Sequence, residues 1–134
     1  MAPHVHLVQI YYEDTDHSGV VYHANYLKYF ERAREHLLGV DELVRLWEQD
    51  EIGFVVYAAS LKFREGATHG ETIEIRTTVT QGSAYRAVFD QQVWRPGGDK
   101  AMVLGEVELC CVDRAGKLVK LPDSVVARVT AMQA

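Results

Sequence analysis

The segment from residue 54 to residue 112 constrains the fold most, because hydrophobic and polar side chains alternate along it with a period of two. Four stretches show the alternation: FVVYAASLKF, ETIEIRTTVT, AYRAVFDQQVWR and DKAMVLGEVELCCV. The connections between them, EGATHG, QGS and RPGGD, consist largely of turn-forming residues. Such alternation is typical of half-buried strands, and short polar connections join antiparallel neighbours. We therefore predict a meander of four consecutive antiparallel strands.

A long amphipathic helix is predicted in the segment NYLKYFERAREHLLGV, with Asn25 as its N-cap and Gly39 as its stop. Its apolar side chains recur at helical spacing and form one strongly aromatic face, made of Tyr26, Tyr29, Phe30, Ala33 and Leu37. A face this apolar must be buried, and the concave side of the sheet is the available surface. The predicted fold class is therefore α+β, with an antiparallel sheet packed around a long central helix.

Shorter elements complete the predicted fold. Residues His6 to Tyr12 alternate like a first strand, Asp41 to about Gln49 has helical spacing, and Pro122 to Met132 is typical of a final helix. A sheet of this size still has exposed edges, which a second copy of the chain can cover. We therefore expect a homodimer.

Length and composition limit the class of protein. With 134 residues, of which 48% are hydrophobic and 25% charged, the chain is expected to form a single domain over residues 1–134. Its 14 basic and 19 acidic residues give a formal charge of -5, which argues against a nucleic-acid partner. The start, MAPHVHLVQI, lacks the features of a signal peptide, and no apolar run is long enough to span a membrane. These features predict a cytoplasmic protein.

The two cysteines, Cys110 and Cys111, are neighbours in a predicted strand. Adjacent strand residues point to opposite faces, so a disulfide between them would be strained. The inward cysteine is expected to be a small core residue.

The densest polar chemistry lies in YYEDTDHSGVVYHANY, between the predicted first strand and the long helix. Asp14, Asp16, Ser18 and Gly19 match the first positions of a calcium-binding EF-hand loop. The twelfth position, however, is Asn25 instead of Glu, and no helix enters the loop. We therefore predict no metal site, and a plain polar turn accounts for only part of the motif.

The position of this turn suggests a reaction site. A helix N-terminus presents unpaired N–H groups that stabilise the developing negative charge on a carbonyl oxygen. A carboxylate beside it can activate water or attack the carbonyl directly. This combination suits acyl transfer or hydrolysis and needs neither a metal nor a cofactor.

The run YYEDTDHSGVVYHANYLKYFERAR, from Tyr11 to Arg34, resembles the hotdog-fold acyl-CoA thioesterases of the 4-hydroxybenzoyl-CoA thioesterase family, and within it the YbgC-like, Tol-Pal-associated subgroup. The resemblance continues more loosely through ASL, THGETIEI and EVELCCVD. It implies a hotdog fold and hydrolysis of short- to medium-chain or aromatic acyl-CoA thioesters to free acid and CoA. The resemblance leaves open whether acyl-carrier-protein thioesters are alternative substrates. It also implies a homodimer or a dimer-of-dimers tetramer, and a functional link to the Tol-Pal system.

The resemblance assigns roles to residues of the turn. Asp16 matches the nucleophile or general base of the family, and whether it acts through an anhydride or through water stays open. Tyr12 and His23 match positions that orient the substrate or tune the carboxylate, and the His23 backbone N–H matches the donor that polarises the carbonyl. Glu13 and Asp14 are expected to cap the turn or face solvent.

Substrate contacts are also implied by the resemblance. Val21, Tyr22 and Ser60 are the predicted substrate-binding positions on the turn and the first strand of the meander. The CoA phosphates are expected to meet basic residues, for which the candidates are Lys62, Arg64 and Arg86, although a solvated strand face also explains these three charges. The chain departs from the family pattern at two places: the turn Gln81-Gly82-Ser83 lacks the basic cluster of the benzoyl-specific enzymes, and Gly66 replaces a common proline.

Two other functions remain open at this point. A hotdog enoyl-CoA hydratase or dehydratase also polarises a thioester carbonyl but reacts at the neighbouring carbons. A noncatalytic acyl-thioester-binding adaptor of the cell envelope would use Asp16 only for binding. Release of a free thiol distinguishes hydrolysis from both.

Overall fold

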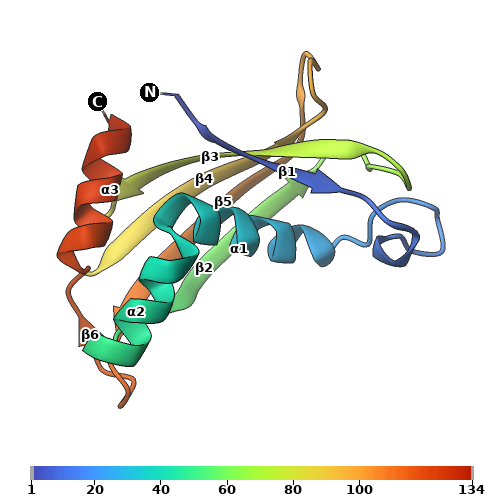
Figure 1. Ribbon diagram of the computed structural model, residues 1–134. Coiled ribbons are helices and arrows are strands. Elements are labelled where there is room, and N and C mark those ends of the chain that lie inside the picture. Colours follow the sequence, from blue (N-terminus) through green and yellow to red (C-terminus); the bar gives the residue numbers. More distant parts are fainter. Residues whose placement is uncertain (1, 134) are drawn as a thin grey trace.

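The computed structural model describes residues 2–133 and consists of an antiparallel sheet with helices packed against it (Figure 1). The strands run in the spatial order β1-β3-β4-β5-β2, and β6 pairs with β5. The predicted α+β class is confirmed. The strands are β1 (His4–Gln9), β2 (Gly53–Phe63), β3 (Thr72–Gln81), β4 (Arg86–Trp94), β5 (Ala101–Val112) and β6 (Leu118–Val119). The helices are the 3-10 helix η1 (Tyr12–Asp14), α1 (Asn25–Leu38), α2 (Val40–Asp50) and α3 (Asp123–Gln133).

The strand order differs from the predicted meander. β3, β4 and β5 are consecutive neighbours, but β2 pairs with β5, for example Leu61 opposite Gly105, and β1 takes the free side of β3. The prediction that all four long strands follow one another in the sheet was therefore wrong. Alternation marks the two faces of a strand, but it carries no information about which strand lies beside it.

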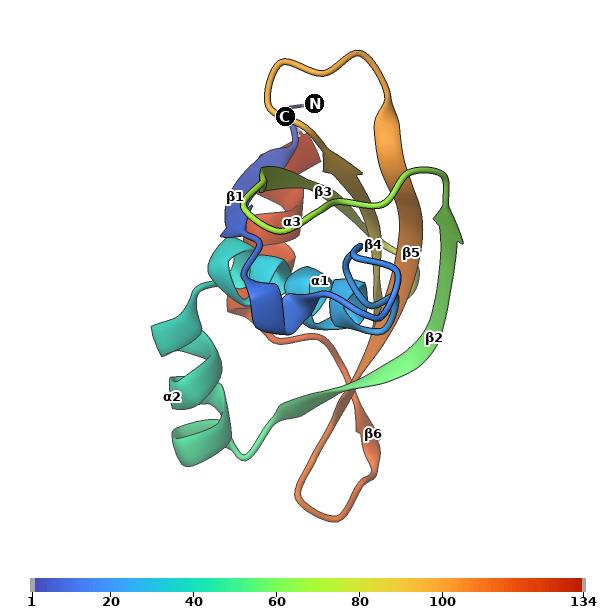
Figure 2. The same ribbon diagram turned by 90° about the vertical axis from the view of Figure 1, so that its right-hand side faces the viewer.

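The central helix α1 lies against the concave face of the sheet, which curves around it (Figure 2). Its predicted aromatic face is buried throughout, and Phe30 is fully inaccessible. Phe30 rests on Gly105 of β5, where an added Cβ would lie 2.6 Å from Phe30 Cε2. A glycine is therefore required for this close approach of helix and sheet. Burying one large apolar side chain contributes about 1.5–3 kcal/mol, so this face anchors the helix.

The termini of β1 and α1 show where local turn chemistry overrides periodicity. β1 ends at Gln9 and not at Tyr12, because the Tyr11 N–H donates to the Asp14 carboxylate (2.8 Å) and the chain turns into η1. Asn25 is not the N-cap of α1 but its first residue, with Ala24 before it. The predicted stop at Gly39 is confirmed, since Gly39 has a φ of 101° that favours glycine.

Cys111 is a core residue, as predicted for the inward cysteine. Burial raises the pKa of its thiol to about 12. Cys110 is also buried, and both thiols are free. Both side chains therefore act as packing groups.

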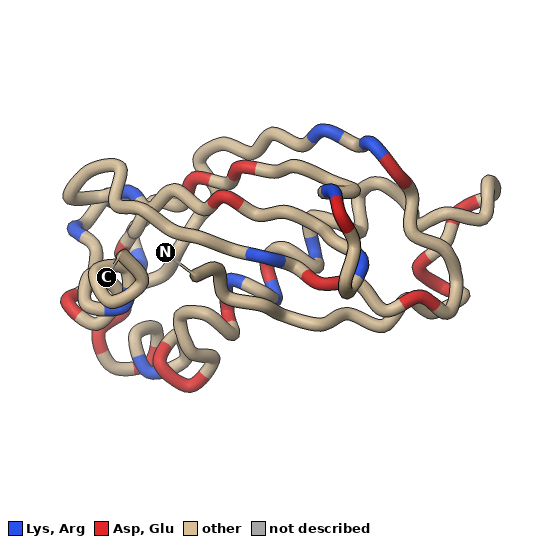
Figure 3. Tube along the Cα trace, turned by 90° about the horizontal axis from the view of Figure 1, so that it is seen from above, with Lys and Arg blue, Asp and Glu red and all other residues tan. Residues whose placement is uncertain are grey.

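Charged residues of both signs are distributed along the whole trace (Figure 3). Positions of Lys and Arg are interspersed with the more numerous positions of Asp and Glu. Within residues 2–133, no helix is both long enough and apolar enough to cross a membrane.

A cluster of histidines joins β1 to α1. The rings of His6 and His36 are stacked, with centroids 4.7 Å apart, and His4 lies on the same face of β1 as His6. Burial lowers the pKa of His4 and of His6, and the charges of Arg128 and Arg32 lower them further. The groups facing one another here are all cationic or able to become cationic.

This cluster predicts that the protein loses stability in acid. Because the folded state depresses the pKa of His4 and His6 below 6.5, it binds fewer protons than the unfolded state, so the free energy of unfolding is highest above pH 6.5 and falls as the pH drops below it. The slope of the free energy of unfolding against pH is proportional to the number of protons that the unfolded state binds in excess of the folded state. We expect His6→Gln to lower this excess by at most about one proton per molecule and so to make the fall less steep. Urea unfolding at several pH values measures the slope. The exposed His69, changed to Gln, is the control, and an equal change of slope in both variants would contradict the prediction.

Candidate active site

The acidic turn is held between β1 and α1 by hydrogen bonds of Asp14. Its carbonyl oxygen accepts from the Tyr22 N–H (2.9 Å) and from Asn25 Nδ2 (3.0 Å), and its carboxylate accepts from the Tyr11 N–H (2.8 Å). Asp14 thus caps the turn, as predicted. The Asn25 side chain ties the first residue of α1 to the same turn, which explains its position without a capping role.

Asp16 begins the tight bend that follows. Its N–H donates to the Val20 carbonyl (2.8 Å), and its Oδ1 accepts from the Ser18 N–H (2.8 Å). Gly19 has a φ of 84°, which this bend requires. Among residues 2–133, the other carboxylate oxygen of Asp16 has no hydrogen-bond partner. The side chain is therefore oriented by one oxygen and can use the other for a ligand or a water molecule.

A cavity of about 250 Å³ opens beside this carboxylate. Four of the predicted site residues line it together, namely Asp16, Val21, His23 and Arg64. The cavity is also lined by five residues that were not among the predicted site residues: Val20, Tyr26, Phe63, Glu65 and Gly66. We call it the Asp16 cavity.

The N-terminus of α1 borders the Asp16 cavity at His23. Among the backbone hydrogen bonds of residues 2–133, none is donated by the amide of His23 or of Ala24. Free amides at the start of a helix combine with the helix dipole to attract an anion or a partial negative charge. The His23 ring packs edge-on against Tyr22 (4.7 Å) and Phe63 (6.1 Å between centroids).

The loop between β2 and β3 forms the opposite wall of the Asp16 cavity. The Val21 N–H donates to the Ala67 carbonyl (2.8 Å), and the Ala67 N–H donates to the Tyr26 hydroxyl (3.3 Å). Burial raises the pKa of Tyr26, which keeps this hydroxyl neutral. An added Cβ at Gly66 would lie 2.8 Å from the Val20 side chain. The glycine at this position, which departs from the family pattern, therefore allows the loop to touch the acidic turn.

Arg95 fastens this loop to the sheet. Its Nε donates to the Glu71 carboxylate (2.6 Å), and its guanidinium also lies 3.5 Å from Glu65. The Arg95 guanidinium holds the pKa of Glu71 below its usual value. Glu65, which lines the Asp16 cavity, is thus part of a charged network at the loop.

The remaining predicted residues do not line the Asp16 cavity. Tyr12 is 78% exposed and packs against His69, and the Tyr22 ring packs against the His23 ring. Ser60 lines a smaller cavity of about 140 Å³ together with Glu106 and Glu108. Lys62 is exposed on β2. Arg86 stacks on Tyr57 (4.6 Å) and pairs with Glu108 (3.6 Å).

Glu65 and Phe63 could have been suspected from their place at the end of a strand, where functional loops often start. Periodicity alone does not distinguish them from the rest of that strand. Among residues 2–133, no group of three or more His, Cys, Asp or Glu side chains is arranged to hold a metal ion.

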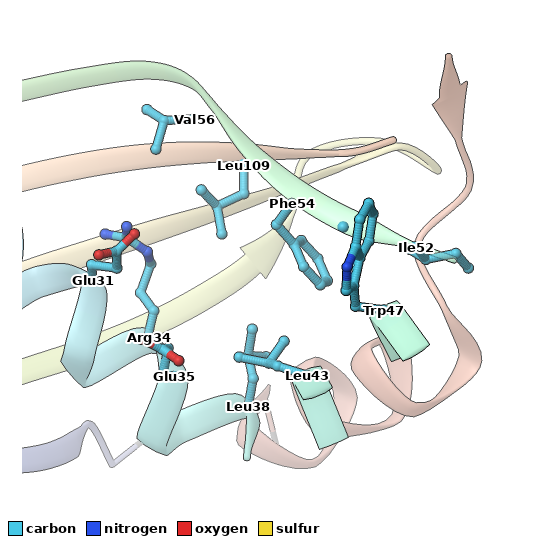
Figure 4. Close-up of a pocket in the computed structure, with 11 residues that line it drawn as sticks. Glu31, Arg34, Glu35, Leu38, Leu43, Trp47, Ile52, Phe54, Val56 and Leu109 are labelled. Atoms are coloured by element: carbon cyan, nitrogen blue, oxygen red, sulfur yellow. The ribbon is translucent and has the colours of Figure 1, made fainter. Parts of the chain in front are cut away.

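A second cavity, of about 210 Å³, lies between α1, α2 and β2 (Figure 4). Most of its wall is apolar and comes from Leu38, Leu43, Trp47, Phe54 and Leu109. Arg34, Glu31 and Glu35 of α1 form its polar end (Figure 4). We call it the Arg34 cavity.

The chain is similar to known thioesterases in sequence and in structure. Residues 11–129 match the model of the thioesterase-like superfamily. An acyl-CoA thioester hydrolase, YbgC of Escherichia coli O6:H1, is 34% identical over 122 residues, which is 90% of each chain. The acyl-CoA thioesterase YbgC of Haemophilus influenzae is 34% identical over 79% of this chain and 78% of its own.

The fold is also that of solved thioesterases. The crystal structure of a 1,4-dihydroxy-2-naphthoyl-CoA thioesterase from Synechocystis superposes with a TM-score of 0.88, at 22% identity and over 97% of both chains. This likeness confirms the predicted hotdog fold. The match to the superfamily model over most of the chain, together with the two YbgC relatives, establishes that this chain belongs to the thioesterase-like superfamily.

Proposed function

We propose that the protein is an acyl-CoA thioesterase, which hydrolyses acyl-CoA to a free acid and CoA at the Asp16 cavity. One observation carries the proposal: a carboxylate with an unused oxygen shares this cavity with His23, whose amide is free at the N-terminus of α1. The YbgC relatives named as acyl-CoA thioesterases support the same chemistry.

In this proposal the thioester carbonyl oxygen accepts a hydrogen bond from the His23 N–H. Negative charge that develops on this oxygen is stabilised by the amide and by the helix dipole. Asp16 either removes a proton from an attacking water or attacks the carbonyl carbon itself. The C–S bond then breaks, and CoA leaves as a thiolate, because a thiol with a pKa of about 8.5 needs no strong acid to depart. If Asp16 itself attacks, the acyl group remains on its carboxylate as a mixed anhydride, and water hydrolyses this anhydride to the free acid and restores Asp16.

The substrate is proposed to enter along β2. Arg64, just after the end of β2, lines the Asp16 cavity, and Lys62 is exposed two residues earlier on β2, so both are placed to meet the phosphates of CoA. Val21 is proposed to contact the acyl group beside Asp16. Tyr12, Tyr22, Ser60 and Arg86 lie outside the Asp16 cavity, and their predicted roles would require contacts with parts of the substrate beyond it.

We further propose that two copies of the chain associate along β2. This strand is an edge of the sheet and exposes a row of apolar side chains, including Val55, Val56, Tyr57 and Phe63. An exposed apolar edge of this length is a template for pairing with another strand. Two-fold symmetry makes the pairing antiparallel, so the Phe63 end of one strand meets the Gly53 end of its partner. The Asp16 cavity of one subunit would then approach the Arg34 cavity of the other. A dimer-of-dimers tetramer remains a prediction from the family resemblance.

A cytoplasmic location fits the two buried free cysteines, since disulfides form mainly in oxidising compartments. The link to the Tol-Pal system is a prediction that comes only from the subgroup resemblance.

The test is release of free thiol from purified protein mixed with hexanoyl-CoA or benzoyl-CoA. We expect thiol and free acid in equal amounts, with the rate unchanged by a chelator. Loss of enoyl-CoA absorbance without thiol release would favour a hydratase instead. Saturable binding of acyl-CoA without any turnover would favour the noncatalytic adaptor.

A further inference from the structure

The Arg34 cavity combines an apolar wall with a buried arginine, and this combination points to a ligand. We propose that Arg34 is a specificity-determining residue that selects acyl groups with an apolar body and a neutral hydrogen-bond acceptor, such as a hydroxyl group, at the far end. The inference rests on the proposed thioesterase function, in which the acyl group reaches this cavity from the Asp16 cavity of the partner subunit.

The orientation of the Arg34 guanidinium is set by the protein. Its Nη1 donates to Gln91 Oε1 (2.9 Å), while Gln91 Nε2 donates to the Phe30 carbonyl (3.0 Å) and to Thr77 Oγ1 (3.1 Å). The last two bonds fix the amide of Gln91, so that its oxygen faces the arginine. Arg34 is thus held in place before any ligand binds, which lowers the entropic cost of recognition.

Most of the hydrogen-bonding capacity of Arg34 is unused. Its side chain is buried, with 6% relative exposure of the residue. Within residues 2–133, Gln91 is its only hydrogen-bond acceptor, and no carboxylate lies within salt-bridge distance. The other N–H groups of the guanidinium are not sealed from solvent, so their acceptor is either water or a ligand in the cavity. The Arg34 side chain is drawn beside the cavity in Figure 4, so a ligand in the cavity can supply this acceptor.

The apolar part of the cavity limits the size of the acyl body. Its volume of about 210 Å³ compares with about 150 Å³ for an apolar cavity that holds benzene. The rings of Trp47 and Phe54 and the side chains of Leu38 and Leu43 surround this part (Figure 4). An acyl body of about six carbons, linear or cyclic, therefore fits.

The acidic side chains near Arg34 favour a neutral hydrogen-bond acceptor on the ligand. Glu31 and Glu35 line the same end of the cavity, and their negative charges offset the positive charge of the guanidinium. A terminal carboxylate would be repelled by these two side chains. A hydroxyl group can accept from Arg34 without adding charge.

The test compares hexanoyl-CoA, 6-hydroxyhexanoyl-CoA and adipoyl-CoA, which differ only in the group at the far end. We expect kcat/KM of the wild-type protein to be at least about tenfold higher for the hydroxyl substrate than for the other two, since hydrogen bonds to charged groups discriminate by this factor or more. Arg34→Met should make kcat/KM for the hydroxyl substrate about equal to that for hexanoyl-CoA. Arg32→Met, an exposed arginine on the same helix, is the matched control and should keep the preference.

The outcomes separate this inference from the proposed function. Absence of thiol release from all three substrates would overturn the thioesterase proposal. Hydrolysis without a preference, or a preference that survives in Arg34→Met, would overturn only the role of Arg34.

A measurement on the wild-type protein covers the case in which Arg34→Met fails to fold. Non-hydrolysable thioether analogues of hexanoyl-CoA and 6-hydroxyhexanoyl-CoA are titrated into protein with ¹⁵N-labelled arginine. We expect the guanidinium signals of Arg34 to shift only with the hydroxyl analogue. Equal shifts with both analogues at saturation, or no shift with either, would overturn the proposal.

Discussion

Replacing Asp16 by asparagine is expected to lower kcat/KM for acyl-CoA hydrolysis by about a thousandfold, with the fold intact. Asparagine keeps an oxygen that can accept from the Ser18 N–H, so the bend of the acidic turn is preserved. It cannot remove a proton from water or attack a carbonyl carbon, and loss of a general base costs about 10²–10⁴ in rate. Thiol release measures the activity, and thermal unfolding confirms that the variant is folded.

The change should appear in kcat and not in KM, because the carboxylate acts in the transition state. His17→Gln is the matched control, since His17 is the exposed neighbour of Asp16 outside the cavity. It is expected to keep activity within about threefold of the wild type. If Asp16→Asn also keeps activity within about threefold of the wild type, Asp16 takes no part in the chemical step, either as a general base or as a nucleophile.

Adding positive charge to the β2 edge is expected to separate the proposed dimer and to remove most activity with it. Val55 and Ala58 pair with Cys110 and Glu108 on the sheet face turned away from α1, so lysines there leave both cavities unchanged. Because the Phe63 end of one strand meets the Gly53 end of the other, the two-fold axis passes near position 58, and the lysines at this position face each other. The lysines at position 55 add further positive charge to the same edge, and like-charge contacts across an interface cost several kcal/mol. We expect Val55→Lys/Ala58→Lys to raise the dimer dissociation constant at least about a hundredfold. Activity at nanomolar protein should fall about tenfold or more.

Analytical ultracentrifugation with activity measured over a range of protein concentrations tests this expectation. The control is Val5→Lys on β1, the opposite edge, because Val5 and Val55 have the same exposure of 47%. The control should leave mass and activity unchanged. A fully active monomer of the β2 variant would mean that each subunit carries a complete site, and the shared-site proposal would fail.

The elements that the sequence predicted well are those specified by near neighbours. The apolar face of α1 follows from a spacing of three and four residues, and Gly39 ends the helix through its own backbone conformation. The long strands follow from alternation in the same way. The pairing of Asp16 with His23 was predicted from the family resemblance, and the bend between them is short and contains Gly19.

The predictions that failed concern contacts between distant segments. β2 pairs with β5 and not with β3, although β3 follows it in the chain. Asn25 was predicted to cap its own helix, but its side-chain amide donates to the Asp14 carbonyl instead. In both cases several partners satisfy the local pattern equally, and only the packed chain selects one of them.

The sequence by itself determined the class of fold, the buried face of the central helix and the place of Asp16 beside a helix N-terminus. Only the tertiary structure decided that the loop at Gly66 closes the Asp16 cavity, that β2 is an exposed edge, and that Arg34 lines a second cavity. The physical reason is the range of the interactions. Periodicity and turn chemistry act over a few residues, whereas cavities and sheet edges arise where segments far apart in the chain pack together.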